Sequence, residues 1–382
     1  PGAEPMKTGL GNAIRIRASR VESIRFFLLG MLSAYFVYRY LSLGTGTYLV
    51  FVTTLLVVLV AAVAGVLPLK WQNLLLNLAI SLLFLDLVFY RIDFRSMFQA
   101  VAGLNYLFLV PSTVFLVLAA FVRAWRWGWL LRSSKPVPFV RLLSALSIGV
   151  AANMVLPARA GEFIRAYILG RREKLSKTTV FATVVLERIF DGLTVLLFLL
   201  LVVSFFIGTH VPEIQYMGVA GALFYVGAIG GLVLVYARVG WLESLIGKLL
   251  PVALGGKLIG LIHAFAEGLE SIRNFRQLAA IVLSSLLFWS VIAASFWPVL
   301  KAFDFGPPVP LYTPFLLVAT LSLALMIPAA PAGIGLFQYA CLLTLRIVFA
   351  PYAAALVAGF DERVAAFSLV VHLSQAVPEI LM

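Results

Sequence analysis

The sequence predicts an all-α, polytopic integral membrane protein with about eight full transmembrane helices and two broken or re-entrant hairpins. Three observations support this fold class. Of the 382 residues, 63% are hydrophobic and 12% are charged, whereas a soluble domain is nearer half apolar and a quarter charged. Apolar runs of about 20 residues, the length that crosses the hydrocarbon core, recur along the chain. Two further apolar segments are interrupted by glycine and proline.

The apolar runs divide the chain into an N-terminal part and a main transmembrane domain. Residues 1–23 form a basic segment, and the apolar run that follows is too long for a signal peptide. We therefore expect two additional transmembrane helices in residues 24–72 and the main domain in residues 73–382. The runs long enough for a full span are Ile24–Leu43, Tyr48–Leu67, Asn73–Tyr90, Leu104–Arg123, Thr179–Ile207, Gly218–Tyr236, Leu278–Leu300 and Ala365–Leu381.

Two segments of the main domain are apolar but broken. Phe139–Leu156 ends in a Pro/Gly-containing stretch, and so does Leu311–Ile327, after which Ile334–Phe349 continues. Proline and glycine release backbone groups that lipid cannot satisfy, so such breaks belong where protein or water can satisfy them. We predict re-entrant or half-helices whose break and gating residues are Pro157, Gly161, Pro328, Pro331, Gly333, Gly335 and Gln338.

Residues 241–276 separate the two halves and do not form a span. Leu258, Leu261, Phe265 and Ile272 recur at helical spacing, with charged residues between them. This pattern is typical of an amphipathic helix that lies along the membrane interface. We interpret it as a surface connector, with gating or partner docking as the alternative.

Basic residues predict the orientation, because Lys and Arg concentrate in cytoplasmic loops. If the first broken segment dips into the membrane and returns, the basic residues of 123–141 and those of 171–177 share the cytoplasmic side. Both chain termini are then cytoplasmic, and the protein is a multi-pass protein of the cell (inner) membrane. We attribute the net charge of +13 to this orientation and to anionic lipid, not to nucleic-acid binding.

Charged residues gather between residues 153 and 191, where the surrounding sequence is apolar enough to lie in lipid. Ionised groups in hydrocarbon cost roughly 2.5–3.5 kcal/mol each and persist when they are paired or face a wet cavity. We therefore predict a site for a polar, anionic lipid headgroup. Its residues are Asn153, Arg159, Glu162, Arg165, Glu187, Arg188 and Asp191. Arg126, interpreted first as part of an interfacial belt with Trp125, Trp127 and Trp129, is a further contact.

The predicted roles follow from charge and helical spacing. The helix that restarts after the break offers N–H groups to an anion, and Arg159 and Arg165 are suited to phosphate. Glu162 and Arg165 have the spacing of an intrahelical pair, as have Arg188 and Asp191. The carboxylates would contact a cationic moiety or carry a proton. The alternative is a buried salt-bridge network that locks two helices together, and both interpretations can hold at once.

One broken segment is predicted to enter from the cytoplasm and the other from the opposite side. Paired interruptions in two halves of a chain are typical of transporters with an inverted repeat and a site at the repeat interface. The alternative is ordinary helix packing with two proline kinks.

Three sequence strings resemble the transmembrane region of lysylphosphatidylglycerol synthases and their stand-alone flippase-like relatives. They are Asn153–Arg165, the Glu187-Arg188-x-x-Asp191 element and Pro331–Gly335. The Arg123–Gly128 segment, ahead of a short basic loop, fits the same pattern, and the resemblance runs from about residue 73 to the C-terminus. We expect a stand-alone member without the soluble aminoacyl-transferase domain. The resemblance implies a lipid transporter that moves an anionic, aminoacylated or isoprenoid-linked lipid between leaflets through a central polar cavity.

The chain departs from that family pattern at two positions. Ala332 stands where such sequences often have a glycine, and Gln338 stands where an acidic residue is common. The missing carboxylate puts an ion-coupled role of position 338 in doubt.

Enzyme motifs are not found in the sequence, which has no phosphate loop, zinc-protease motif or nucleophile elbow. The three histidines lie on different segments, so we expect no metal and no cofactor. The alternative to a transporter is a membrane-embedded lipid-modifying transferase, with Glu187 or Asp191 as base, or its scaffold subunit, acting with a cytoplasmic partner enzyme. The sequence leaves open whether the chain acts as a homodimer.

Overall fold

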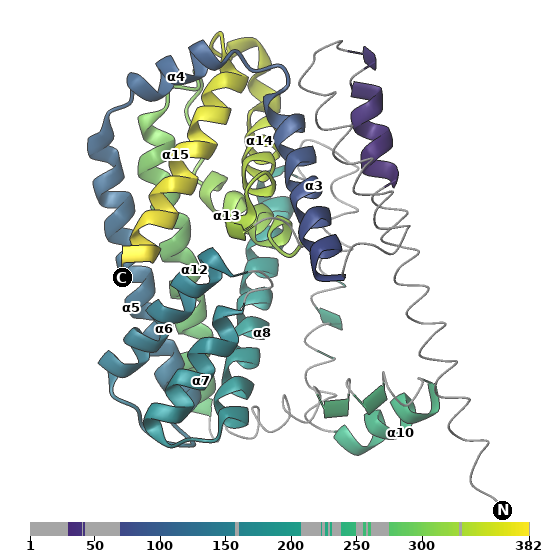
Figure 1. Cartoon of the computed structure of the whole chain (residues 1–382). Coiled ribbons are helices and arrows are strands. Elements are labelled where there is room, and N and C mark those ends of the chain that lie inside the picture. Colours follow the sequence, from purple (N-terminus) through teal and green to yellow (C-terminus); the bar gives the residue numbers. More distant parts are fainter. Residues whose placement is uncertain are drawn as a thin grey trace, which may run out of the picture. The chain divides into compact units, whose positions relative to one another are not determined.

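All regular elements among the described residues of the computed structural model are helical, as the sequence predicts (Figure 1). The structure describes residues 30–39, 41–42, 69–156, 160–207, 223, 226–227, 230, 238–249, 255–256, 259–260, 275–327 and 331–381. The chain divides into two compact units, residues 1–90 with 327–336, and residues 91–326 with 337–382.

The larger unit contains most of the described elements, including those that build the candidate site. Asp93 caps the first of them, because its carboxylate accepts hydrogen bonds from the backbone N–H groups of Arg95 and Ser96. In chain order these elements are α4 Phe94–Ala102, η1 Tyr106–Phe108, α5 Leu109–Leu131, α6 Phe139–Val155, α7 Gly161–Glu173, α8 Lys177–Val202, the π-helical turn η3 Val203–Ile207, α10 Val239–Leu249, α12 Phe275–Ala302, α13 Thr313–Ala324, α14 Leu336–Phe349, η5 Ala350–Ala355 and α15 Phe360–Leu381.

Four described helical stretches are long and apolar enough to cross a membrane, and the consecutive helices α3 (Leu69–Phe89) and α4 make a fifth if they count as one broken span. The predicted spans at 104–123, 179–207 and 278–300 are confirmed. The predicted span at 24–43 is helical over residues 30–39 and 41–42, whereas those at 48–67 and 218–236 lie wholly or largely outside the described residues. The four stretches are Tyr106–Leu131, Lys177–Phe206, Phe275–Ala302 and Leu336–Ala355.

The last of these stretches corrects part of the second predicted hairpin. Because α14 and η5 run on together, Leu336–Ala355 reaches 20 residues and has the length of a full span, not of a half-helix. The predicted break itself is present, since α13 ends at Ala324 and α14 begins at Leu336.

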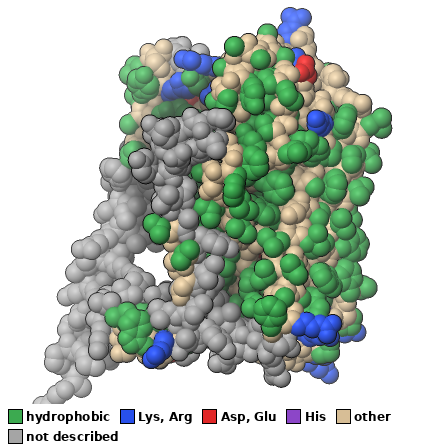
Figure 2. All heavy atoms as spheres, turned by 180° about the vertical axis from the view of Figure 1, so that it is seen from behind, with side chains coloured by type: hydrophobic (Ala, Val, Ile, Leu, Met, Phe, Trp, Pro, Cys, Tyr) green, Lys and Arg blue, Asp and Glu red, His purple; other side chains and the backbone are tan. Residues whose placement is uncertain are grey.

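Helices α5 and α12 pack along each other, joined by a hydrogen bond of 2.8 Å from the Ser112 hydroxyl to the Ser295 carbonyl. Ala119 and Val122 of α5 meet Phe288 and Val291 of α12 in a buried apolar group. A larger core lies where α5, α6, α7, α8 and α12 converge. Apolar side chains also cover the middle of the face in Figure 2, with Lys and Arg toward its upper and lower ends, as expected of a multi-pass membrane protein.

The first predicted break separates α6 from α7, which lie against each other at one end of α5, α8 and α12 (Figure 1). They have 17 and 13 residues, so at 1.5 Å per residue neither reaches about 30 Å. Gly149 and Gly161 allow their close approach, because a Cβ on Gly161 would collide with the Gly149 carbonyl oxygen. The two helices therefore form an interrupted hairpin.

The far end of this hairpin is fixed by Glu173, which is 2% exposed. Arg141 donates to its carboxylate at 2.6 Å and Lys135 at 3.0 Å. These hydrogen bonds hold the pKa of Glu173 below its usual range. Lys174 ends α7 in the left-handed conformation, at φ 54°.

The smaller unit pairs the helical residues 30–39 with α3. The Tyr35 hydroxyl donates to Asp86 at 2.7 Å, and the Arg39 guanidinium donates to the same carboxylate at 2.9 Å. The second break begins in this unit with η4 (Pro331–Gly333), where Ala332 has a φ of 59°.

The predicted amphipathic segment at 241–276 is described in part. Helix α10 covers its beginning, while Leu258 and the apolar positions from Leu261 to Ile272 lie outside the described residues.

Candidate functional site

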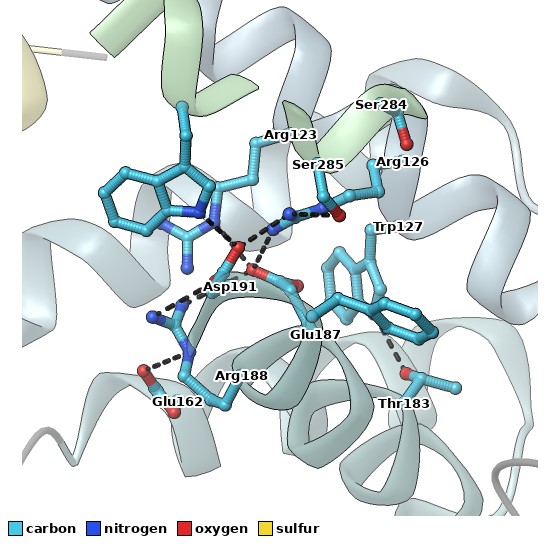
Figure 3. A network of polar contacts seen from close by, with 12 residues as sticks. Arg123, Arg126, Trp127, Glu162, Thr183, Glu187, Arg188, Asp191, Ser284 and Ser285 are labelled. Carbon is cyan, nitrogen blue, oxygen red and sulfur yellow. Dashed lines mark hydrogen bonds and ion pairs between the residues drawn. The ribbon is translucent and has the colours of Figure 1, made fainter. Parts of the chain in front are cut away.

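Helix α8 brings two carboxylates to one face, because Glu187 and Asp191 are four residues apart. Glu187 is completely buried and Asp191 is 4% exposed. Figure 3 shows both carboxylates turned toward the arginines that surround them. Buried carboxylates persist only when cations or donors compensate their charge, and here that compensation comes from α5, α7, α8 and α12.

Glu187 is the centre of this group and contacts four guanidinium groups. Its Oε1 lies 2.8 Å from Nε of Arg123, and its Oε2 lies 3.0 Å from Nη1 of Arg165. Arg126 and Arg188 each approach Oε1 at 3.4 Å. Because these arginines belong to α5, α7 and α8, a single carboxylate ties three helices together.

Asp191 extends the network to α12. Its Oδ1 accepts hydrogen bonds from Arg126 at 2.6 Å and from the Trp289 indole at 2.9 Å. Arg126 also donates to the Ser285 hydroxyl at 3.0 Å. Arg188 reaches Oδ2 at 3.5 Å, which confirms the predicted pair at a spacing of three.

Glu162 lies at the edge of the network and pairs across helices. Its carboxylate is 3.1 Å from Nε of Arg188, and Figure 3 shows that guanidinium between Glu162 and Asp191. The predicted intrahelical pair of Glu162 with Arg165 is wrong, because Arg165 turns into the core toward Glu187. Tertiary contacts thus override the local spacing.

These charged residues form a group that we call the arginine cluster: Arg123, Arg126, Arg165, Arg188, Glu162, Glu187 and Asp191. Four arginines against three carboxylates leave an excess of one positive charge among the described residues. In this part of the chain, Nε of Arg126 and both Nε and Nη2 of Arg165 are buried without a hydrogen-bond partner. Such donors are costly to leave unsatisfied, so they are the groups of the cluster that are available to a further acceptor.

Two of the arginines lie over aromatic rings. The guanidinium carbon of Arg165 lies 5.0 Å from the ring centre of Trp127, and that of Arg126 lies 5.1 Å from Phe288. The predicted interfacial role of Arg126 and Trp127 is wrong, because both are fully buried. Trp127 instead donates to the Thr183 hydroxyl at 3.0 Å.

A small cavity adjoins the cluster between α5, α6 and α12. Its volume is about 60 Å³, and Arg123, whose side chain is 18% exposed, forms part of its wall. This space suits a few water molecules. Its remaining lining residues are Leu116, Ala119, Ala120, Leu143, Leu146, Ser147, Val150, Phe288 and Ile292.

The other predicted site residues have separate positions. Asn153 accepts a hydrogen bond of 2.8 Å from the Gly161 N–H, so one of the N–H groups expected to face an anion is used within the hairpin. Gln338 lies on α14, 3.0 Å from Nδ1 of His372 on α15. Gly333 and Gly335 have positive φ angles of 69° and 90°. Pro157, Arg159 and Pro328 lie outside the described residues, and Pro331 begins η4.

Sequence reasoning missed three contributors to the cluster. Arg123 carried a usable signal, since it stands three residues before Arg126 and shares its helix face. Ser285 and Trp289 carried none, because a serine and a tryptophan in an apolar span are ordinary residues until α12 is packed against α5 and α8.

Comparison with known proteins identifies the family of the chain. The model of the lysylphosphatidylglycerol synthase TM region matches residues 74–373. The chain belongs to this family. The match begins where the resemblance of the sequence strings was predicted to begin, and family membership indicates a role connected with membrane lipids.

Three relatives of this family member have similar sequences. Glycosyltransferase AglD of Haloferax volcanii is 27% identical over 52% of this chain and 36% of its own length. UPF0104 membrane protein MJ1595 of Methanocaldococcus jannaschii is 25% identical over 37% of this chain and 43% of its own length. UPF0104 membrane protein MJ1078 of the same organism is 26% identical over 53% of this chain and 82% of its own length. The chain thus spans less than half of the first two relatives. No solved structure matches it.

Proposed function

We propose that this protein is a flippase-like lipid transporter, which moves a lipid with an anionic or modified headgroup between the leaflets of the cell membrane. The observation that carries the proposal is the arginine cluster, which is buried among apolar helices and has one excess positive charge. A site with this charge attracts a phosphate-bearing headgroup and offers it several planar donors.

The unsatisfied donors of Arg126 and Arg165 support the same proposal. A phosphate oxygen would accept from them without displacing Glu187 or Asp191. The cavity beside Arg123, at about 60 Å³, is smaller than a headgroup, so binding requires the neighbouring helices to separate. We assign that movement to the hairpin of α6 and α7. Its two short helices are separated by an interruption, and interrupted helices are typical of transporter sites.

The carboxylates divide into two roles in this proposal. Glu187 holds the four arginines at one place, while Glu162, at the edge of the cluster, is positioned to meet a cationic group on the lipid. An aminoacylated headgroup carries a negative phosphate and a cationic amine, whereas a simple phosphate headgroup carries only the negative charge. Isoprenoid-linked phosphates fit the arginines equally well, so the lipid panel includes all three classes.

The test measures lipid movement in proteoliposomes with fluorescent phosphatidylglycerol, an aminoacylated form and an isoprenoid phosphate. Arg123→Gln removes the excess charge but leaves Glu187 with three arginines. We expect the rate for the preferred lipid to fall at least about tenfold, because a charge-assisted hydrogen bond contributes roughly 1.5–3 kcal/mol. Arg123→Lys, which keeps the charge, should recover part of the rate.

The matched control is Arg132→Gln, which changes an arginine just after the same helix. Arg132 lies 4.5 Å from the Trp129 ring, outside the cluster, so its variant should move lipid at the wild-type rate. Equal rates for Arg123→Gln and wild type would contradict the headgroup site. Absence of movement for every lipid in folded wild-type protein would contradict transport.

A second candidate function is a lipid-modifying transferase or its scaffold subunit, acting with a cytoplasmic enzyme. It is favoured by the relative named glycosyltransferase AglD, of whose length the matched part is 36%. This function predicts conversion of a lipid in detergent micelles, where no second leaflet exists. A chemically unchanged lipid that changes leaflet supports the transporter instead.

A further inference from the structure

A groove lined mostly by apolar side chains runs along α6 beside α5. Its volume is about 450 Å³, within the range of ligand sites in proteins. Small side chains hollow it, while apolar side chains at its rim face outward, such as Val140, which is 74% exposed. The groove residues are Val117 and Phe121 of α5 and Val140, Leu143, Ser144, Ser147, Ile148 and Ala151 of α6.

The groove has the length of one membrane leaflet. The α6 positions that line it run from residue 140 to residue 151, about 16 Å of helix at 1.5 Å per residue. Half of the hydrocarbon core is about 15 Å. The groove is therefore about as long as an acyl chain that lies in one leaflet.

The groove lies beside the cavity that adjoins the arginine cluster. Leu143 and Ser147 line it on one side and line the cavity beside Arg123 on the other. These two side chains thus separate lipid from the partly exposed member of the cluster. The Ser147 hydroxyl already donates to the Leu143 carbonyl at 3.0 Å, so it presents no unsatisfied polar group to a chain that passes it.

A cation lies against one of the groove residues. Arg172, in the last turn of α7, donates to the Ser144 hydroxyl at 3.3 Å. Its exposed guanidinium can reach a phosphate at the membrane interface while the acyl chain follows α6. This charge distinguishes a lipid from a second transmembrane helix, whose apolar side chains would gain nothing from an arginine at the rim.

From these contacts we infer that the α5–α6 groove binds an acyl chain of an anionic phospholipid and is the lateral entrance to the arginine cluster. The inference rests on the proposed transport function and adds to it the route by which the lipid arrives. Arg172 holds the phosphate first, and α6 then separates from α5 at Leu143 and Ser147, so that the headgroup reaches Arg123.

The test uses phosphatidylglycerol with a photoreactive acyl chain in proteoliposomes of the full chain, followed by mapping of the labelled residues. We expect labelling of residues 140–151 that exceeds labelling by a photoreactive phosphatidylcholine. Ala151→Phe fills the groove without touching the cluster, and should lower this labelling about tenfold, since the ring displaces at least two methylene groups. Val114→Phe, on a 59% exposed position of α5 outside the groove, is the control and should leave labelling unchanged.

Headgroup recognition is tested with Arg172→Gln and Arg172→Lys. The glutamine variant should abolish the preference for phosphatidylglycerol, and the lysine variant should retain it. Equal labelling of the groove and of the face around Val114, or no headgroup preference in wild type, would overturn the inference. So would efficient dimer crosslinking through Ile148→Cys, because a second copy would then occupy the groove.

The same samples separate this inference from the proposed function. Selective groove labelling without lipid movement would reject transport and keep the acyl-chain site. Lipid movement without selective labelling would keep transport and reject the groove as its entrance.

Discussion

Replacing Glu187 by glutamine should destabilise the protein more than any other single carboxylate change in the arginine cluster. The substitution keeps the side-chain volume but removes the charge that faces four guanidinium groups at 2.8–3.4 Å. The excess charge of the cluster then rises from one to two. Breaking a buried ion pair by removing one partner costs about 3–5 kcal/mol, and the remaining arginines also repel one another.

The assay is the melting temperature of detergent-purified protein, followed by loss of the monodisperse peak in size-exclusion chromatography. A loss of this size corresponds to a decrease on the order of 10 °C. Glu162→Gln is the matched control, because Glu162 makes one partly exposed pair with Arg188. Its loss should be below about 1 kcal/mol, a shift of only a few degrees.

A double variant sharpens the test. Arg165→Met in the Glu187→Gln background removes one of the arginines left without their partner and keeps an apolar side chain against Trp127, 5.0 Å from the Arg165 guanidinium. We expect it to melt above Glu187→Gln alone, since neighbouring changes couple. If Glu187→Gln and Glu162→Gln melt within about 2 °C of each other, the cluster does not hold these helices together and our reasoning is wrong.

Three other predictions use the same melting assay. Gly161→Ala should cost about 1–3 kcal/mol, because its Cβ would collide with the Gly149 carbonyl; unchanged melting would show that α6 and α7 can separate freely. Ala332→Gly should raise stability by about 1 kcal/mol, since Ala332 has a φ of 59° and only glycine adopts that region without a Cβ penalty; a lower melting temperature would contradict this. Hydrogen bonds from Arg141 and, to a smaller extent, Lys135 lower the pKa of Glu173 in the folded protein. These bonds therefore stabilise the fold fully above the pKa of about 4.3 that Glu has in the unfolded chain. The stabilisation is lost as the pH falls through the lower pKa of Glu173 in the folded protein. Glu173→Gln should therefore lower melting at neutral pH and reduce the difference between neutral and acidic pH, and an unaltered pH profile would refute the assignment.

Much of the architecture was predictable, because lipid restricts which sequences can lie within it. A chain without apolar runs cannot cross the hydrocarbon core, and a break at glycine or proline must be satisfied by protein or water. The spans that became α5, α8 and α12 and the break between α6 and α7 followed from this restriction. The length of the 20-residue stretch from Leu336 could not be predicted, since apolar residues alone do not show where a helix continues into a 3-10 turn.

The sequence by itself thus determined the membrane class, the breaks and the presence of costly charges near Glu187 and Asp191. It also determined the pair of Arg188 with Asp191, because a spacing of three places two residues on one helix face. Only the tertiary structure decided that Arg123 and Arg165 meet Glu187, that Trp289 meets Asp191, and that Asn153 accepts a hydrogen bond from the first N–H group of α7. The reason is physical: helical periodicity fixes the neighbours within one helix, whereas neighbours across helices depend on how the helices cross, and close contacts such as that of Gly149 with Gly161 set that crossing.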